Sequence, residues 1–186
     1  MGHGIHQFDL LLSVLGPWES VVAVAARRAR RVETEDVSLA LVSFADGTVA
    51  SVVNSVVSPR QVSSLRFDYS RATVELSHLY GYTDDSWTVT PAPGHSAVAD
   101  RWSALAGSTV QSGHADQLTA VLDALDAGVA PPVTLADTRR TMEFVAAVYA
   151  SAFTGERVHS GQLGPDDPFA GRMNGTGAPW QAVRTR

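Results

Sequence analysis

The feature that most limits the fold of this chain is an Asp-Gly pair between two stretches rich in β-branched residues. Asp46-Gly47 separates residues 37–44 from residues 48–57. Because Asp-Gly at such a junction is one of the strongest short-range signals of a β-hairpin, the two stretches are predicted to be antiparallel strands. Further strands are predicted at residues 20–26, 62–69, 72–76 and 86–90. Five or six strands in hairpin order imply a largely antiparallel sheet.

Helical periodicity precedes and follows these strands. Apolar residues recur at helical spacing over residues 3–15, and Gly16-Pro17 ends that pattern. Two longer helices are predicted at residues 113–127 and 134–154, with a short one near Trp102. Their predicted apolar stripes include Leu118, Leu122 and Leu125 in the first, and Met142, Val145 and Val148 in the second.

The order helix, strands, helices predicts an α+β fold, in which helices pack on one face of a mostly antiparallel, open-faced sheet of five to six strands. We expect one domain over residues 1–158. Residues 159–186 are rich in Gly, Pro and Asp without periodicity, so an irregular C-terminal tail is expected there.

Composition excludes several classes of function. The net charge of −5 disfavours nucleic-acid binding, and the one basic cluster, residues 27–31, is interpreted as a solvated strand end. The chain has no cysteine and no lysine, which excludes disulfides, thiolate metal sites and Schiff-base chemistry. A chain rich in Ala, Val and Arg without lysine suggests a bacterial genome rich in GC. No apolar run approaches the ~20 residues of a membrane helix, and no signal peptide is visible, so a cytoplasmic protein is expected.

Motifs for nucleotide binding are missing from the sequence. No Gly-x-Gly-x-x-Gly follows a predicted strand, and Gly2-His3-Gly4 lacks both the preceding strand and the third glycine. The sequence also contains no Gly-x-Ser-x-Gly, His-Glu-x-x-His or P-loop motif. We therefore expect no Rossmann domain and no cofactor-binding residues in this chain.

The first predicted helix carries an unusual cluster of polar residues. His3, His6 and Gln7 share one helix face, because they are spaced three and four residues apart. The positive end of the helix dipole is expected to lower the pKa of a histidine at a helix start, which favours the neutral imidazole and suits it to accept a proton. The alternative is that both histidines are surface or packing residues. A metal site is disfavoured because Asp9 points away from His3.

Residues 4–12, Gly-Ile-His-Gln-Phe-Asp-Leu-Leu-Leu, resemble the central motif of the glucose–fructose oxidoreductase / inositol dehydrogenase / MocA family. Similar support comes from the hairpin at residues 45–48, the helix and turn at residues 114–132, and residues 149–155. The resemblance covers residues 2–158 in order. It implies a C-terminal domain of the dihydrodipicolinate-reductase-like type.

The resemblance also implies site residues and a cofactor. His6 matches the family histidine that relays or accepts the substrate proton, and Asp9 matches an aspartate expected to be structural. Gly2 departs from the family pattern, which has an acidic or amide residue at that position, so His3 is a second candidate. Substrate contacts are expected from Arg66, Tyr80, Tyr82 and His114. In that family an N-terminal Rossmann domain, missing here, binds NAD or NADP, so no cofactor is expected on this chain alone.

Three functions follow as hypotheses. The first is the substrate-binding and dimerisation domain of an NAD(P)-dependent dehydrogenase of sugars or polyols, inactive without the Rossmann domain. The second is a non-enzymatic dimerising or regulatory module, a homodimer or larger assembly formed through apolar strands such as residues 49–53. The third is a binder of a small polar ligand.

Overall fold

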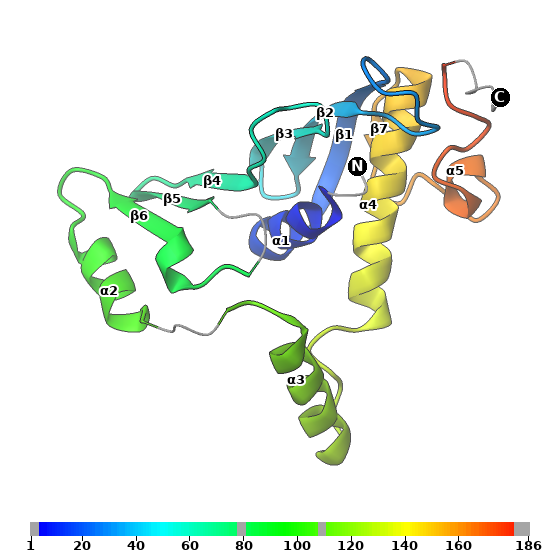
Figure 1. The fold of residues 1–186 in the computed structure, drawn as a ribbon. Helices are drawn as coiled ribbons and strands as arrows, with labels where there is room; N and C mark the ends of the chain where they lie inside the picture. Colours follow the sequence, from blue (N-terminus) through cyan, green and yellow to red (C-terminus); the bar gives the residue numbers. More distant parts are fainter. Residues whose placement is uncertain (1–3, 78–80, 108–110, 181–186) are drawn as a thin grey trace. The chain divides into compact units, whose positions relative to one another are not determined.

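The computed structural model describes residues 4–77, 81–107 and 111–180 (Figure 1). The α-helices are α1 Ile5–Leu15, α2 Ala97–Leu105, α3 His114–Asp126, α4 Leu135–Thr154 and α5 Pro168–Gly171, with a 3-10 helix, η2, at Asp84–Ser86. The strands are β1 Trp18–Ala26, β2 Val37–Phe44, β3 Val49–Ser55, β4 Ser64–Asp68, β5 Ala72–Ser77, β6 Trp87–Pro91 and β7 Val158–His159. Every strand and helix predicted from the sequence is present, with ends shifted by about one to two residues.

The strands form two antiparallel sheets, one of four strands in the order β3-β2-β1-β7 and one of three in the order β4-β5-β6. The Asp46-Gly47 turn joins β2 to β3 as predicted, with Gly47 at φ +87, where glycine is favoured. The Asp46 carboxylate accepts a hydrogen bond from the backbone N–H of Thr48, which lowers the pKa of Asp46. The predicted α+β class is confirmed, with the strands divided between two sheets.

Contacts between the elements divide the chain into two compact units. The first unit combines residues 1–59 with residues 135–186, and the second comprises residues 60–134. The first therefore holds α1, the four-stranded sheet, α4 and α5, and the second holds the three-stranded sheet, α2 and α3. The predicted boundary between a domain at 1–158 and a tail stays a prediction.

The core of the first unit lies between its helices and one face of the four-stranded sheet. Phe144 of α4 is fully buried, and its ring meets Phe8 of α1 and Trp18 of β1 edge to face, with ring centroids 5.4 Å apart in both pairs. Leu12 of α1 and Val42 of β2 complete the same cluster. This packing fixes α1 against α4 and the sheet, and α1 is the helix that carries His6.

The two long helices differ in what their apolar stripes contact. In α4, Val145 and Val148 are buried as predicted, whereas Met142 is 39% exposed. Met142 lies outside the buried face because Thr141, Phe144 and Val145 set the direction of that face.

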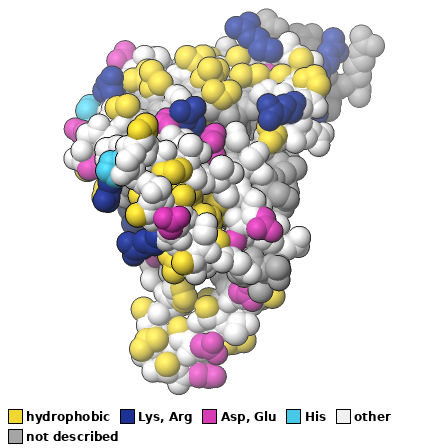
Figure 2. Space-filling model, turned by 90° about the vertical axis from the view of Figure 1, so that its left-hand side faces the viewer, with side chains coloured by type: hydrophobic (Ala, Val, Ile, Leu, Met, Phe, Trp, Pro, Cys, Tyr) yellow, Lys and Arg dark blue, Asp and Glu magenta, His cyan; other side chains and the backbone are white. Residues whose placement is uncertain are grey.

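In α3, the predicted stripe exists but lies in solvent. Leu118, Leu122 and Leu125 are 62%, 60% and 63% exposed, and the only buried side chain of α3 is Ala124. Figure 2 shows apolar and acidic side chains together at the surface of this helix, at the lower end of the view.

The loop between β1 and β2 holds the basic cluster. The buried carboxylate of Asp36 accepts hydrogen bonds from the backbone N–H groups of Arg28, Ala29 and Arg30 at 2.7, 2.7 and 2.9 Å. The bonds from Ala29 and Arg30 are the main reason that the pKa of Asp36 is lowered to about 2. The side chains of Arg28 and Arg30 remain exposed at this strand end.

Residues 160–180 consist mostly of turns and follow the surface of the first unit. The side chain of Asp167 accepts a hydrogen bond from the N–H of Phe169 and so caps α5. Phe169 is buried and meets Phe153 of α4, and Trp180 meets the same ring while its indole N–H donates to the carbonyl of Glu33 at 3.1 Å. Among the described residues, no helix has the length and apolar character required to cross a membrane.

Candidate functional site

The predicted proton-accepting histidine lies on an exposed part of a well-anchored helix. His6 is the second residue of α1, and its side chain is exposed rather than packed among apolar residues. On the same helix, Phe8 and Leu12 are buried in the core. The helix therefore holds the imidazole at a defined place while leaving it accessible.

The start of α1 is fixed by a close approach to strand β3. Gly4, the N-cap residue, is buried, and a Cβ atom added there would overlap the side chain of Asn54. Because glycine has no Cβ atom, another part of the chain can approach its backbone closely. In this fold the approaching group is the Asn54 side chain, so Gly4 helps to seat the helix that carries His6.

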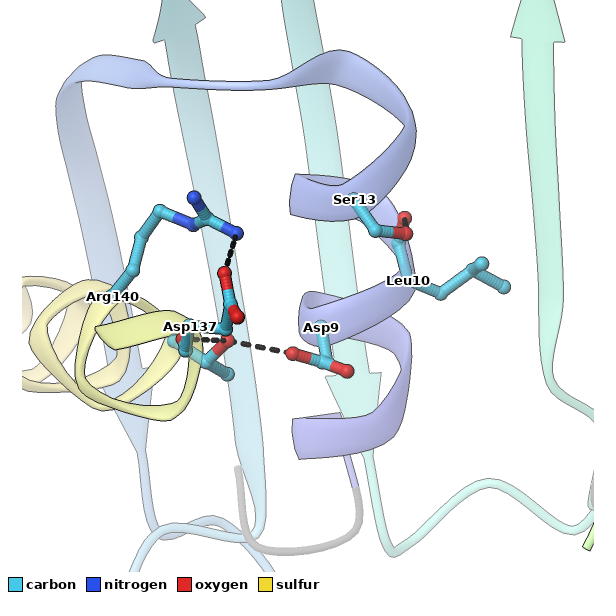
Figure 3. A network of polar contacts seen from close by, with 6 residues as sticks. Asp9, Leu10, Ser13, Asp137 and Arg140 are labelled. Atoms are coloured by element: carbon cyan, nitrogen blue, oxygen red, sulfur yellow. Dashed lines mark hydrogen bonds and ion pairs between the residues drawn. The ribbon is translucent and has the colours of Figure 1, made fainter. Parts of the chain in front are cut away.

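Asp9 links α1 to α4. Its carboxylate accepts a hydrogen bond from the hydroxyl of Thr141 at 2.7 Å, and one turn earlier Asp137 pairs with Arg140 at 3.2 Å (Figure 3). A hydrogen bond to a carboxylate is stronger than a hydrogen bond between two neutral groups. The hydrogen bond joins α1 to α4. It is compatible with the structural role expected for Asp9.

The second unit holds the remaining predicted substrate contacts. Arg66 of β4 forms an exposed ion pair with Asp68 at 3.0 Å, and the hydrogen bond and charge of Asp68 raise the pKa of Arg66. His114 is the first residue of α3 and lies 3.5 Å from the side-chain oxygen of Gln117. His3 and Tyr80 lie outside the described residues.

Tyr82 lies beside an open hollow of about 300 Å³ within the second unit. The described residues that line it include Tyr82, Asp84, Trp87, Gln111, Ser112 and Asp116. Tyr82 and Trp87 meet edge to face with their ring centroids 6.5 Å apart. The structure thus brings one predicted residue, Tyr82, to a concave surface, and Asp116 of that surface follows His114 by two positions.

The residues present do not form a nicotinamide-nucleotide site. All strand pairs among the described residues are antiparallel, whereas the dinucleotide-binding fold is built on parallel βαβ units. The described residues also contain no group of three or more His, Asp or Glu side chains placed to hold a metal ion.

The sequence of residues 1–75 matches the model of a known protein family, the GFO/IDH/MocA C-terminal domain. The first 75 residues of this chain are therefore similar to a GFO/IDH/MocA C-terminal domain. The match includes His6, Asp9 and the β2–β3 hairpin, which are the residues and motif that suggested the family from the sequence. No functionally curated protein is detectably similar in sequence to this chain.

Several solved structures share the fold of this chain. The WlbA dehydrogenase from Bordetella pertussis, solved with NADH and UDP-GlcNAcA, is 23% identical and covers 86% of this chain and 45% of its own, with a TM-score of 0.69. The UDP-N-acetylglucosamine 3-dehydrogenase GnnA from Acidithiobacillus ferrooxidans is 18% identical and covers 79% and 44%, with a TM-score of 0.61. An aldose-aldose oxidoreductase from Caulobacter crescentus, complexed with glycerol, is 18% identical and covers 84% and 45%, with a TM-score of 0.62.

The chain thus spans about 45% of the length of these solved proteins. More than half of each of them has no counterpart in the residues of this chain.

Several residues of the candidate site and of its supporting contacts were not foreseen from the sequence. Asn54 and Thr141 hold α1 from positions distant in the chain, so no local pattern indicates them. Trp87 was placed in a predicted strand, and its nearness to Tyr82 follows from the loop that η2 forms between them. The sequence signal for this pair was the short Thr-Asp-Asp-Ser turn at residues 83–86, which has an aromatic residue on each side.

Proposed function

We propose that this chain is the substrate-side half of an NAD(P)-dependent oxidoreductase that acts on a sugar, a polyol or a related hydroxy compound. The observation that carries the proposal is the placement of His6, exposed on a helix that is anchored by Gly4, by Phe8 and by the Asp9–Thr141 hydrogen bond. The resemblance assigns the family's proton relay to this histidine. The lack of cysteine is compatible with our further proposal that the protein works in a bacterial cytoplasm.

The role proposed for His6 is to take or relay the proton of the substrate hydroxyl. A neutral imidazole within hydrogen-bond reach of that hydroxyl can accept the proton as the carbon is oxidised. A nicotinamide held by a separate nucleotide-binding domain would supply the hydride acceptor. Both parts must meet the same carbon atom at once, so this chain alone is expected to show no turnover.

Two assays test this proposal. The purified chain, supplied with NAD or NADP and a panel of polyols and sugars, is expected to give no change in nicotinamide absorbance. In an assembly that includes a nucleotide-binding half, His6→Ala is expected to lower kcat by about 10²- to 10⁴-fold, the usual contribution of a positioned base. His95→Ala, which removes another exposed histidine, serves as the matched control and should leave kcat unchanged.

Turnover by the isolated chain, or unchanged kcat in the His6→Ala assembly, would refute the enzymatic proposal. An assembly that shows no turnover with any compound of the panel would instead favour the hypothesis of a non-enzymatic assembly module, which has no use for His6.

We also propose that the chain forms a homodimer or larger assembly through the open face of the four-stranded sheet. Val24, Leu39 and Val53 are opposite one another on β1, β2 and β3, and they are 60%, 47% and 67% exposed. Leu41 and Val49 extend this apolar row on the face opposite the buried cluster. An apolar patch of this kind on a soluble fold usually marks an interaction surface.

The association is tested by measuring molar mass in solution. Wild type is expected to have at least twice the mass of one chain, and Leu41→Glu is expected to give the mass of a single chain, because a charge at the centre of an apolar interface is left without a partner. Leu105→Glu on α2 is the control, since Leu105 is exposed but lies outside the sheet face. A monomeric wild type would rule out the dimer.

A further inference from the structure

The open hollow of the second unit has a chemistry of its own. Its two sides are residues 82–87 and residues 111–116, and the backbone N–H of Ser112 donates a hydrogen bond to the carbonyl of Tyr82 at 2.8 Å. The carboxylate of Asp84 accepts a hydrogen bond from the N–H of Gly107 at 3.0 Å. These two hydrogen bonds fix residues 82–87, which line the hollow, to residues 107 and 112. All of its lining residues belong to the second unit.

One part of the hollow is aromatic. Tyr82 and Trp87 both line the hollow, and their rings stand at 82° to each other. A ring face packs well against the C–H groups of a saturated ring, and the polar tips of Tyr and Trp can bond hydroxyl groups. This combination suits a compound that has both apolar and hydroxyl-bearing sides, such as a sugar or cyclitol.

The remaining lining is neutral or negatively charged. Gln111 and Ser112 offer donors and acceptors, and Asp84 and Asp116 add two carboxylates. No arginine or histidine is among the described residues that line the hollow. Carboxylates accept hydrogen bonds from hydroxyl and ammonium groups, whereas they repel a carboxylate or phosphate of a ligand.

We propose that this hollow binds a polyhydroxylated compound that is neutral or carries an amino group, and that it rejects sugar acids and sugar phosphates. The inference goes beyond the proposed function, because the hollow belongs to the second unit and its ligand is inferred from the hollow alone. Binding to the hollow needs neither His6 nor a nicotinamide. It can therefore succeed or fail independently of the catalytic proposal.

The test is a titration of the purified chain followed by the indole N–H signal of Trp87 in an NMR spectrum. The chain has four tryptophans, and Trp87→Phe assigns the signal. myo-Inositol, glucosamine and glucuronate are added separately at equal concentration, pH and ionic strength. We expect inositol and glucosamine to shift the signal in a saturable way, with glucosamine binding more tightly, and glucuronate to leave it unchanged.

Removal of one carboxylate should weaken the preference for the amine. Asp116→Asn is expected to reduce the affinity for glucosamine about two- to fivefold, the size of an exposed charge interaction, with little effect on inositol. Asp123→Asn, at an exposed position of the same helix that does not line the hollow, is the matched control and should change neither affinity.

Three results would overturn the inference: no shift with inositol or glucosamine, equal binding of glucuronate, or an equal loss with Asp116→Asn and Asp123→Asn. Loss of kcat on His6→Ala with an unresponsive Trp87 would leave the oxidoreductase proposal standing and reject the hollow as a binding site.

Discussion

Helices α4 and α3 have similar apolar stripes and very different surroundings. Eight of the 20 residues of α4 are buried, against the sheet, α1 and the tail, whereas one of the 13 residues of α3 is buried. Helical periodicity indicates that a stripe exists, and it cannot indicate whether another element covers it. The comparison indicates that stability in this chain comes mainly from the first unit. Substitutions in α4 should therefore cost more than substitutions in α3.

The largest effect is expected from the centre of the α4 interface. Phe144→Ala removes a fully buried ring that contacts Phe8 and Trp18, and we expect a loss of about 3–5 kcal/mol in the free energy of unfolding. The loss arises because the ring leaves a cavity that its neighbours fill only in part. Urea unfolding followed by circular dichroism measures it.

Leu122→Ala on α3 is the matched control for Phe144→Ala. Leu122 is 60% exposed, and alanine is a good helix former, so the unfolding free energy should change by less than about 0.5 kcal/mol. Equal losses for the two variants would contradict the comparison between the helices.

The stabilisation of the loop before β2 by Asp36 is expected to depend on pH. The pKa of Asp36 is about 2 in the folded chain and close to 3.8 in an unfolded one, so its stabilisation is complete above pH 3.8 and disappears as the pH falls through 2. Asp36→Asn should therefore lower Tm at pH 7, because an amide is a poorer acceptor for the N–H groups of Arg28, Ala29 and Arg30. The difference in Tm from wild type should shrink between pH 4 and pH 2.

Thermal unfolding of wild type and Asp36→Asn at a series of pH values checks this, with Asp123→Asn as an exposed control. A Tm difference that stays constant down to pH 2 would show that the carboxylate charge does not stabilise the loop.

Local patterns were sufficient to predict most of the secondary structure of this chain, but not η2, β7 or α5. The Asp46-Gly47 turn, the alternation in strands and the periodicity in α1 and α4 all report on neighbours within a few residues. The contacts that seat α1 are different, because Gly4 meets Asn54 and Asp9 meets Thr141 across 50 and 132 positions. The sequence therefore identified His6 as a candidate through a resemblance, while what anchors its helix became visible only in the folded chain.

A smaller effect is expected from the hydrogen bond between α4 and α1. Thr141→Val removes the hydroxyl that donates to Asp9 at 2.7 Å, and we expect a loss of about 1 kcal/mol, since water can reach the exposed carboxylate. The hydroxyl of Thr119 in α3 bonds only its own helix, at the carbonyl of Ala115, so Thr119→Val is the control, with a change within about 0.5 kcal/mol.

Hydrogen exchange of the α1 amides gives a second readout for Thr141→Val. Exchange should become faster in α1 and stay unchanged in β2 if the bond holds the helix in place. Uniform acceleration across the whole first unit would indicate a general loss of stability instead.

The smallest effect on stability per residue is expected from the apolar stripe of α3. Replacing Leu118, Leu122 and Leu125 together by glutamine should change the unfolding free energy of the isolated chain by about 0.5 kcal/mol or less for each position, because each side chain is at least 60% exposed. Urea unfolding measures the sum. A loss of several kcal/mol would mean that the stripe is covered in solution, since burial of a leucine contributes about 2–5 kcal/mol on truncation. In that case α3 would resemble α4 after all, and the difference between the two helices would lie in their partners rather than in their exposure.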